Sequence, residues 1–163
     1  MQPLQLREAE EKDIQTIRTL AREIWHQHYP AIISHEQIDY MLQLMYSGES
    51  LKEQMLLKHH RFFLIQLNET AFGFMSLHEE DRGKWFLNKF YIDQSKSSKG
   101  YGTQALQLII AKLKPKKITL TVNRQNFKSV NFYFKNGFVI ERVADFDIGN
   151  GFVMNDFVMQ WEE

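Results

Sequence analysis

The sequence predicts a mixed α/β fold built on a mostly antiparallel sheet of about six to seven strands, flanked by helices. Helical periodicity dominates the first third of the 163 residues, a three-stranded meander follows, and strands then alternate with helices. Gly and Pro are scarce, at 8 and 3 residues, and no repeat or linker interrupts the chain. We therefore expect a single domain over residues 1–163.

The first third is predicted to hold a short extended piece and three helices. Its apolar residues recur every three to four positions, as on one face of a helix. Two of the helices are preceded by Ser with Gln or Glu three residues later, the pattern of a capping box. The expected segments are an extended piece at 3–7, helices at 11–26 and 34–46, and a short helix from the Ser50–Glu53 box to Leu56.

The remainder is predicted to contain six strands and two helices. Runs rich in Phe, Ile and Val are separated by turn residues, and Gly73 within one run predicts a β-bulge. A polar loop at 93–99 precedes the first helix, and Asn136-Gly137 ends the second. The expected strands are 61–67, 70–77, 85–92, 118–122, 138–146 and 152–161, and the expected helices are 100–114 and 126–135.

Composition excludes several classes of protein. Twenty acidic residues balance twenty basic ones, which argues against a nucleic-acid or membrane-surface partner. The chain has no cysteine, so disulfides, thiolate nucleophiles and Cys-ligated metals are excluded. No apolar run is long enough to span a bilayer, and the N-terminus lacks a signal-peptide pattern. We therefore expect a cytoplasmic protein. We also expect no bound metal, because His59-His60 is not accompanied by the further ligands that a metal site needs.

The first chemical motif is a strand, a polar loop and then Gly100-Tyr101-Gly102 at the start of a helix. A helix N-terminus offers free backbone N–H groups, and glycines let a bulky anion approach them. This pattern favours a phosphate site. A Walker loop is absent, and the dinucleotide fingerprint lacks its third glycine. A simple tight turn and a nucleotide-binding domain remain open on this motif alone.

The second motif spans Asn126 to Phe138. Asn126 is placed to cap the following helix, and Tyr133 lies two turns later on the same face. A phenol beside a thioester can protonate a leaving thiolate as a general acid. Taken alone, Tyr133 is also compatible with a core residue.

Together the two motifs resemble those of the GCN5-related N-acetyltransferase (GNAT) superfamily, over nearly the whole chain. That family carries Gln/Arg-x-x-Gly-x-Gly/Ala on the first loop and Asn…Tyr-x-x-x-Gly-Phe on the second. The resemblance implies the GNAT fold, with its sheet splayed at the cofactor site, and an acetyl-CoA-dependent N-acetyltransferase. The matching residues are Gly100-Tyr101-Gly102 and the run from Asn126 through Tyr133 to Gly137-Phe138.

The resemblance also implies a role for each matching residue. Tyr133 is implied to protonate the departing CoA sulfur. The implied acetyl-CoA contacts are the backbone of Phe90, Tyr91 and Ile92 for the pantetheine arm, Ser97, Ser98, Lys99, Gly100, Tyr101, Gly102 and Thr103 for the pyrophosphate, and Asn126 and Ser129 for the cofactor arm. Tyr133 is implied to be a cofactor contact as well.

Two positions depart from the family pattern. Ser97 replaces the Gln or Arg of the first loop, with Lys99 as a compensating charge. Asn88 stands where many members carry a glutamate on the strand before the loop, so the general base is left open. The open candidates are His28, His78, Glu79, Asp145 and Asp147.

The substrate is expected to be an amine. In the family the first two helices shape the acceptor pocket, here Trp25 to Tyr46, where aromatic and acidic side chains suit a cation. The tail from Asp145 to Asp156 is loosely similar to polyamine and diamine acetyltransferases, which favours a small amine or polyamine. Without a cysteine to carry the acyl group, direct attack in a ternary complex is expected. The alternative is a weakly catalytic acyl-CoA-binding sensor. The family resemblance and the aromatic last strands are compatible with a homodimer, which charge and composition leave open.

Overall fold

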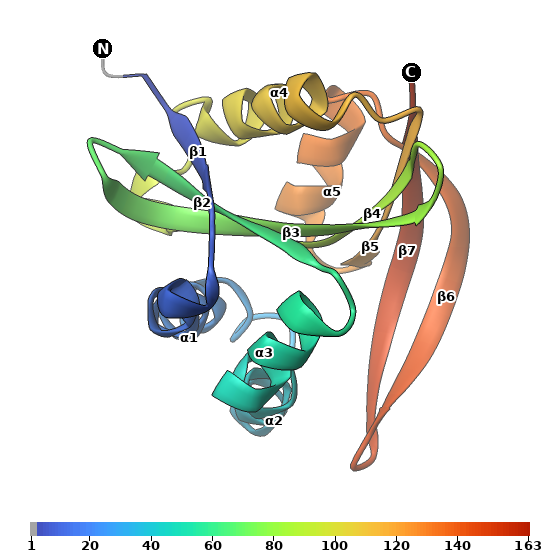
Figure 1. The fold of residues 1–163 in the computed structure, drawn as a ribbon. Coiled ribbons are helices and arrows are strands. Elements are labelled where there is room, and N and C mark those ends of the chain that lie inside the picture. Colours follow the sequence, from blue (N-terminus) through green and yellow to red (C-terminus); the bar gives the residue numbers. More distant parts are fainter. Residues whose placement is uncertain (1–2) are drawn as a thin grey trace. The chain divides into compact units, whose positions relative to one another are not determined.

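The computed structural model describes residues 3–163, so the first two residues of the predicted domain lie outside it (Figure 1). Seven strands form one sheet in the order β1-β2-β3-β4-β5-β7-β6, which confirms the mixed α/β class. The strands are β1 (Gln5–Glu8), β2 (Arg61–Leu67), β3 (Thr70–Asp81), β4 (Lys84–Ile92), β5 (Lys117–Asn123), β6 (Val139–Gly149) and β7 (Phe152–Glu162). The helices are α1 (Ile14–His28), α2 (His35–Tyr46), α3 (Gly48–Leu56), α4 (Tyr101–Leu113) and α5 (Phe127–Lys135), with 3-10 turns η1 (Glu11–Asp13) and η2 (Gln94–Lys96).

The chain divides into two compact units. Unit 1 comprises Met1–His78 and Lys89–Lys114, and unit 2 comprises Glu79–Asn88 and Pro115–Glu163. Strands β3 and β4 continue from one unit into the other. The single domain over residues 1–163 stays a prediction.

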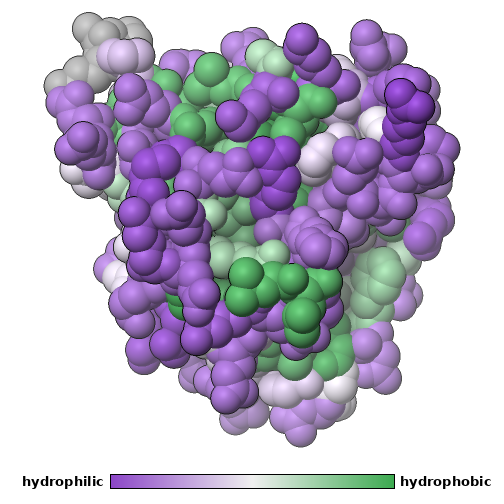
Figure 2. Space-filling model, in the orientation of Figure 1, coloured by the Kyte–Doolittle hydropathy of each residue, from purple (hydrophilic) through white to green (hydrophobic). Residues whose placement is uncertain are grey.

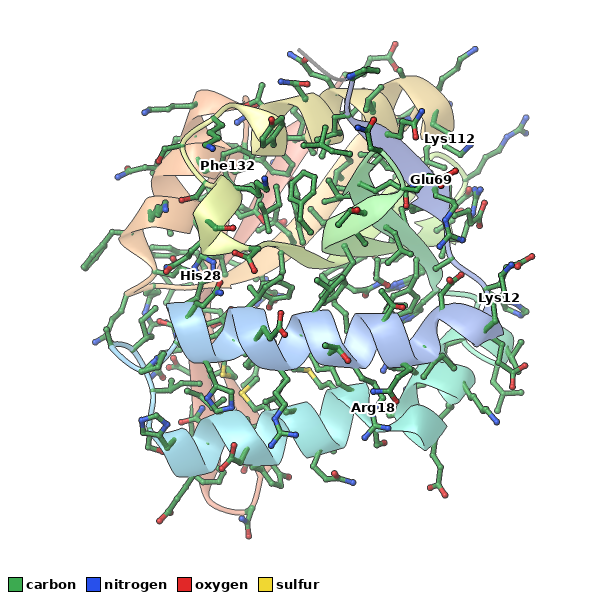
Figure 3. All side chains as sticks on the ribbon, turned by 90° about the vertical axis from the view of Figure 1, so that its left-hand side faces the viewer. Lys12, Arg18, His28, Glu69, Lys112 and Phe132 are labelled. Carbon is green, nitrogen blue, oxygen red and sulfur yellow. The ribbon has the colours of Figure 1, made fainter. Side chains whose placement is uncertain are left out.

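Unit 1 packs helices on both sides of its strands. β1 pairs antiparallel with β2, and β2 pairs antiparallel with β3. Helices α1 to α3 lie on one side of these strands and α4 lies on the other (Figures 1 and 3). Apolar side chains from the helices and strands are fully buried between them, among them Ile17, Ile24, Phe63, Ile65 and Phe74.

The helix caps confirm one prediction and correct another. The Ser34 hydroxyl accepts a hydrogen bond from the Gln37 N–H at 3.1 Å, as the first capping box predicts. The second predicted box is wrong, because Ser47 caps α3 and accepts from the Ser50 N–H at 3.2 Å. Ser47 is extended and serves both as the C-cap of α2 and as the N-cap of α3. Ser50 therefore lies inside the helix, where its hydroxyl accepts from Gln54.

Gly73 lies beside the predicted bulge. The β2–β3 register shifts between Ile65, which pairs with Gly73, and Gln66, which pairs with Ala71, so Phe72 is the extra residue. A Cβ added to Gly73 would lie 2.5 Å from the carbonyl oxygen of Tyr91. Only a residue without a side chain allows β3 to approach β4 this closely.

We expect Gly73→Ala to destabilise the protein by about 2 kcal/mol, because the added methyl group must push two backbones apart. Gly48→Ala is the matched control, since no atom lies within 4 Å of its added Cβ, and we expect its effect to be neutral or stabilising. Chemical denaturation of both variants measures the difference. Equal stability of the two variants would contradict the close approach.

Unit 2 is built on β5, β6 and β7, with α5 beside them (Figure 1). β7 pairs antiparallel with both β5 and β6. β5 also pairs in parallel with β4, over three residues that end at Phe86 and Thr119. Within the described part of unit 2 the β4–β5 ladder stops there, although β5 continues to Asn123.

Candidate functional site

The N-terminus of α4 presents unsatisfied backbone donors. Gly100 is its N-cap in a left-handed conformation (φ 80°), and no described side chain caps it. The first hydrogen bond of the helix runs from the Gln104 N–H to the Gly100 carbonyl at 3.1 Å. The N–H groups of the three residues between them therefore precede the helical ladder.

This N-terminus is also open to a large anion. A Cβ added to Gly100 would meet no atom within 4 Å, and Ser98, Lys99 and Gly100 are exposed. Ser98 adopts a positive φ of 63°, which turns the chain immediately before the helix. The free donors, the positive end of the helix dipole and the Lys99 charge fit the pyrophosphate of coenzyme A.

The loop that leads to α4 is anchored within unit 1. The Gln94 N–H donates to the Gln27 side-chain oxygen at 3.0 Å, and the Asp93 N–H donates to the Phe72 carbonyl at 2.8 Å. The Ser97 hydroxyl donates to the Gln94 carbonyl at 2.9 Å. The short side chain at position 97 therefore stabilises the loop itself.

The end of β4 is held by α1. Tyr91 lies among the rings of Trp25 and Phe74, each at a centroid distance of 5.7 Å, and its hydroxyl is 3.2 Å from that of Tyr29. His28, at the C-terminal end of α1, places Nε2 3.3 Å from the Ile92 carbonyl (Figure 3). Unit 1 thus brings Phe90, Tyr91 and Ile92 into the strand that leads directly into the loop.

The predicted acceptor segment differs from expectation. Trp25 and Tyr29 are 1% and 7% exposed, so their rings belong to the core and present no open face to a cation. Most of the exposed residues of the segment are polar. His26 stacks on His35 at 6.2 Å, and its Nε2 is 3.7 Å from the Asp39 carboxylate.

The start of α5 in unit 2 forms as predicted. The Asn126 side chain caps the helix by accepting from the Ser129 N–H at 3.3 Å, while the Asn126 N–H donates to the Asn123 carbonyl at 3.0 Å. Tyr133 is 8% exposed and packs against Phe132 and Phe138, with centroids 5.4 and 5.3 Å away. Unit 2 thus places Asn126, Ser129 and Tyr133 on one helix.

The five candidate bases are divided between the units, with His28 and His78 in unit 1 and Glu79, Asp145 and Asp147 in unit 2. Glu79 and Asp147 are exposed, and Asp145 is ion-paired with Arg124 at 3.0 Å. His78 stacks on His60 at 4.6 Å. Burial is the main cause that lowers the pKa of His60 to about 4, with smaller contributions from the neighbouring His78, Lys89 and Lys58.

One buried acid was not among the predicted site residues. Asp156 in β7 is 5% exposed, and burial raises its pKa to about 6, against the smaller effect of Arg124. The alternation of side chains along a strand could have indicated its burial, because Asp156 lies two residues before the buried Val158 and so points to the same face of the sheet.

Two further features of the described residues bear on function. No three His, Asp or Glu side chains among residues 3–163 are placed to hold a metal ion. In the same part of the chain, no helix is long and apolar enough to cross a membrane.

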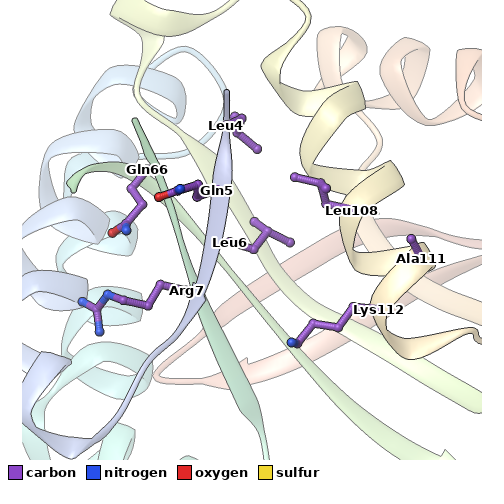
Figure 4. A pocket seen from close by; sticks show the side chains of 8 residues that line it. All are labelled: Leu4, Gln5, Leu6, Arg7, Gln66, Leu108, Ala111 and Lys112. Atoms are coloured by element: carbon purple, nitrogen blue, oxygen red, sulfur yellow. The ribbon is translucent and has the colours of Figure 1, made fainter. Parts of the chain in front are cut away.

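A cavity of about 690 Å³ lies between β1 and α4 in unit 1. Leu4 and Leu6 face Leu108 and Ala111 across it (Figure 4), and Figure 2 shows hydrophobic side chains on this face of the molecule. Its lining contains none of the predicted cofactor residues. The cavity therefore lies outside the candidate site.

Comparison with known proteins identifies similar families and structures. The model of the acetyltransferase (GNAT) family matches residues 15–138. A spermidine N(1)-acetyltransferase from Thermoplasma acidophilum is 30% identical over 159 residues, which cover 93% of this chain and 95% of that protein.

Solved structures share the fold. The PaiA N-acetyltransferase of Thermoplasma acidophilum, solved in complex with coenzyme A, superposes with a TM-score of 0.79 at 27% identity, over 99% of both chains. A GCN5-related N-acetyltransferase from Rhodopseudomonas palustris superposes with a TM-score of 0.80 at 17% identity, over 100% of this chain and 98% of the other.

Proposed function

Because this chain belongs to the acetyltransferase (GNAT) family and is an acetyl-CoA-dependent N-acetyltransferase, we propose that it acetylates a primary amine of a small amine or polyamine. The spermidine acetyltransferase that is 30% identical over most of both chains supports this substrate class. The absence of cysteine from the sequence supports direct attack by the amine in a ternary complex.

The observation that carries the proposal is the open, uncapped N-terminus of α4 at Gly100. We assign the pyrophosphate to the loop Ser97, Ser98, Lys99, Gly100, Tyr101, Gly102 and Thr103, chiefly to its backbone N–H groups. Bound acetyl-CoA supplies the activated thioester. Its pantetheine arm is assigned to the backbone of Phe90, Tyr91 and Ile92 and to the side chains of Asn126 and Ser129.

Two proton movements are needed for the reaction. The substrate ammonium must lose a proton before its nitrogen can attack, and the departing sulfur must gain one. We assign the second step to the Tyr133 hydroxyl. Its ring packs against the rings of Phe132 and Phe138, which supports a fixed position for the hydroxyl.

We further propose a cytoplasmic homodimer that acts without nucleic acid or membrane. β6 is an outer strand of the sheet and carries the exposed apolar side chains Val139 and Val143, which supports an interface with a second copy.

Release of free thiol from acetyl-CoA in the presence of an amine panel tests the proposal. We expect turnover with spermidine or a diamine and none with a tertiary-amine analogue, which has no nitrogen that can form the stable amide. Calorimetric titration with coenzyme A is run in parallel. Binding without turnover of any amine would replace the proposal with a cofactor sensor, and absence of binding would contradict both.

The sensor alternative is supported by two positions. The Ser97 hydroxyl donates to Gln94, so position 97 offers the cofactor no long donor. Asn88 supplies no carboxylate on β4.

A further inference from the structure

Asp156 is a buried acid that the fold does not neutralise. Its Oδ1 is inaccessible to solvent and has no hydrogen-bond partner among the described residues. A buried unpaired carboxylate oxygen is costly, and acids are seldom buried unless they are paired. Stability alone does not account for an acid at this position.

The nearby cation is engaged elsewhere. Arg124 donates through Nη1 to the main-chain carbonyls of Asp156 and Ala144, at 3.2 and 3.3 Å. Its Nη2 donates to the Asp145 carboxylate at 3.0 Å. The guanidinium therefore fixes the backbone around Asp156 and leaves the Asp156 Oδ1 unpaired.

Thr121 connects this buried carboxylate to the surface. Its hydroxyl forms a hydrogen bond with the Asp156 side chain, and the Thr121 residue is exposed. In the β5–β7 register Thr121 lies opposite Val158, and Asn123 lies opposite Asp156. Because side chains alternate along a strand, these four residues share one face of the sheet.

The pair lies where β5 leaves the β4 ladder. The last β4–β5 pair is formed by Thr119, and Thr121 follows two residues later on the same face. Asn123 comes two residues after that, and its carbonyl accepts from the N–H of Asn126, the cap of the helix that carries Tyr133. Within unit 2, Asn123 thus links the strand position opposite Asp156 to the cap of the helix that carries Tyr133.

We propose that Asp156 receives the proton of the substrate ammonium through the Thr121 hydroxyl, an inference that rests on the proposed acetyl transfer. An N–H proton passes to the Thr121 oxygen as the Thr121 proton passes to the Asp156 carboxylate. The freed lone pair forms the C–N bond to the acetyl carbon while the C–S bond breaks. The sulfur takes its proton from the Tyr133 hydroxyl. The nitrogen then gives its second proton to the Tyr133 oxygen, which reprotonates the tyrosine. Asp156 later releases its proton to water.

The electrostatic surroundings suit this role. Burial raises the pKa of Asp156 to about 6, Arg124 and the Thr121 hydrogen bond act in the opposite direction, and Asp145 adds a small increase. At pH 7 the carboxylate is therefore ionised and still basic enough to accept a proton.

Asp156→Asn tests the role without changing the size of the side chain. We expect kcat with spermidine to fall about a hundredfold, the KM for spermidine to change little, and the acidic limb of the kcat profile near pH 6 to disappear. Glu141→Gln, which neutralises an exposed acid of the same hairpin, is the control and should behave as wild type.

The relay is tested separately. Thr121→Val should reproduce the loss of kcat, and Thr121→Ser should retain most of the activity because it keeps the hydroxyl. Carboxyl carbon NMR of the unliganded protein should show Asp156 titrating near pH 6, and at a higher pH in Thr121→Val. Titration near the ordinary value of about 4 would overturn the proposal.

The outcomes also separate this proposal from the function on which it rests. Suppose that the wild type turns over but Asp156→Asn keeps its pH profile, or shows only an increased KM. Either result would overturn the role of Asp156 and leave the acetyltransferase function standing. Absence of turnover by the wild type with every amine would overturn both.

Discussion

Tyr133→Phe is expected to lower kcat about a hundredfold at neutral pH while the Kd for acetyl-CoA stays nearly unchanged, because general acids contribute about 10²–10⁴ to a rate. The substitution removes only the hydroxyl. Phe132 and Phe138 pack on the ring at 5.4 and 5.3 Å, and a phenylalanine preserves both contacts. The variant should therefore fold normally and bind the cofactor.

Stopped-flow or steady-state thiol release gives kcat, and calorimetric titration gives the Kd. A melting temperature equal to that of the wild type serves as the folding control. An unchanged kcat would remove Tyr133 from the role of acid, whereas a parallel loss of binding would indicate a cofactor contact instead.

Lys89→Met is expected to stabilise the protein by about 2 kcal/mol at pH 7, since it removes a buried charge. Lys89 is 8% exposed, and its Nζ donates to the Gln54 side-chain oxygen at 2.6 Å, near the rings of Tyr46 and Phe62. No described carboxylate forms an ion pair with it. Loss of the bond to Gln54 offsets part of the gain.

The pH dependence gives the sharper measurement. Burial, with the charge of Lys58, lowers the pKa of Lys89 from 10.5 to about 8, a change equivalent to about 3 kcal/mol. Between these pH values the unfolded chain binds a proton that the folded chain does not. The free energy of unfolding therefore rises as the pH increases from about 8 to 10.5. Below pH 8 Lys89 is charged in the folded protein, and the full cost of burying that charge is present.

Denaturant titrations at several pH values compare wild type, Lys89→Met and the control Lys52→Met, which alters an exposed lysine of α3. The stability difference between wild type and Lys89→Met should shrink as the pH rises through this window, and Lys52→Met should follow wild type. A constant difference across the window would mean that Lys89 carries no perturbed charge.

Local signals predicted most of the elements. The strand at 61–67 and the helix capped by Asn126 were predicted from periodicity and capping chemistry, which act over a few residues. The error at α3 came from two serines that compete for one helix start. Ser47 is the N-cap of α3 because the chain is already extended at that residue, where α2 ends. Neither residue type nor spacing distinguishes such competitors.

Roles that depend on burial were not predictable. Trp25 and Tyr29 suited a cation site by composition, yet both rings pack in the core beside Tyr91. Asp156 looked like one acid among several in the tail. Its environment is produced by Thr121 and Arg124, which are more than 30 residues away in the chain.

The sequence by itself determined the fold class and the two motifs that led to the acetyltransferase family, because periodicity, glycine positions and capping residues are local properties. Only the tertiary structure showed that the predicted helix start at Gly100 is open to a large anion and that Gly73 permits β3 to approach β4. It alone showed that Lys89 and Asp156 are buried ionisable groups. The physical reason is that solvation and proton affinity depend on neighbours brought together by folding, and these neighbours are distant in the sequence.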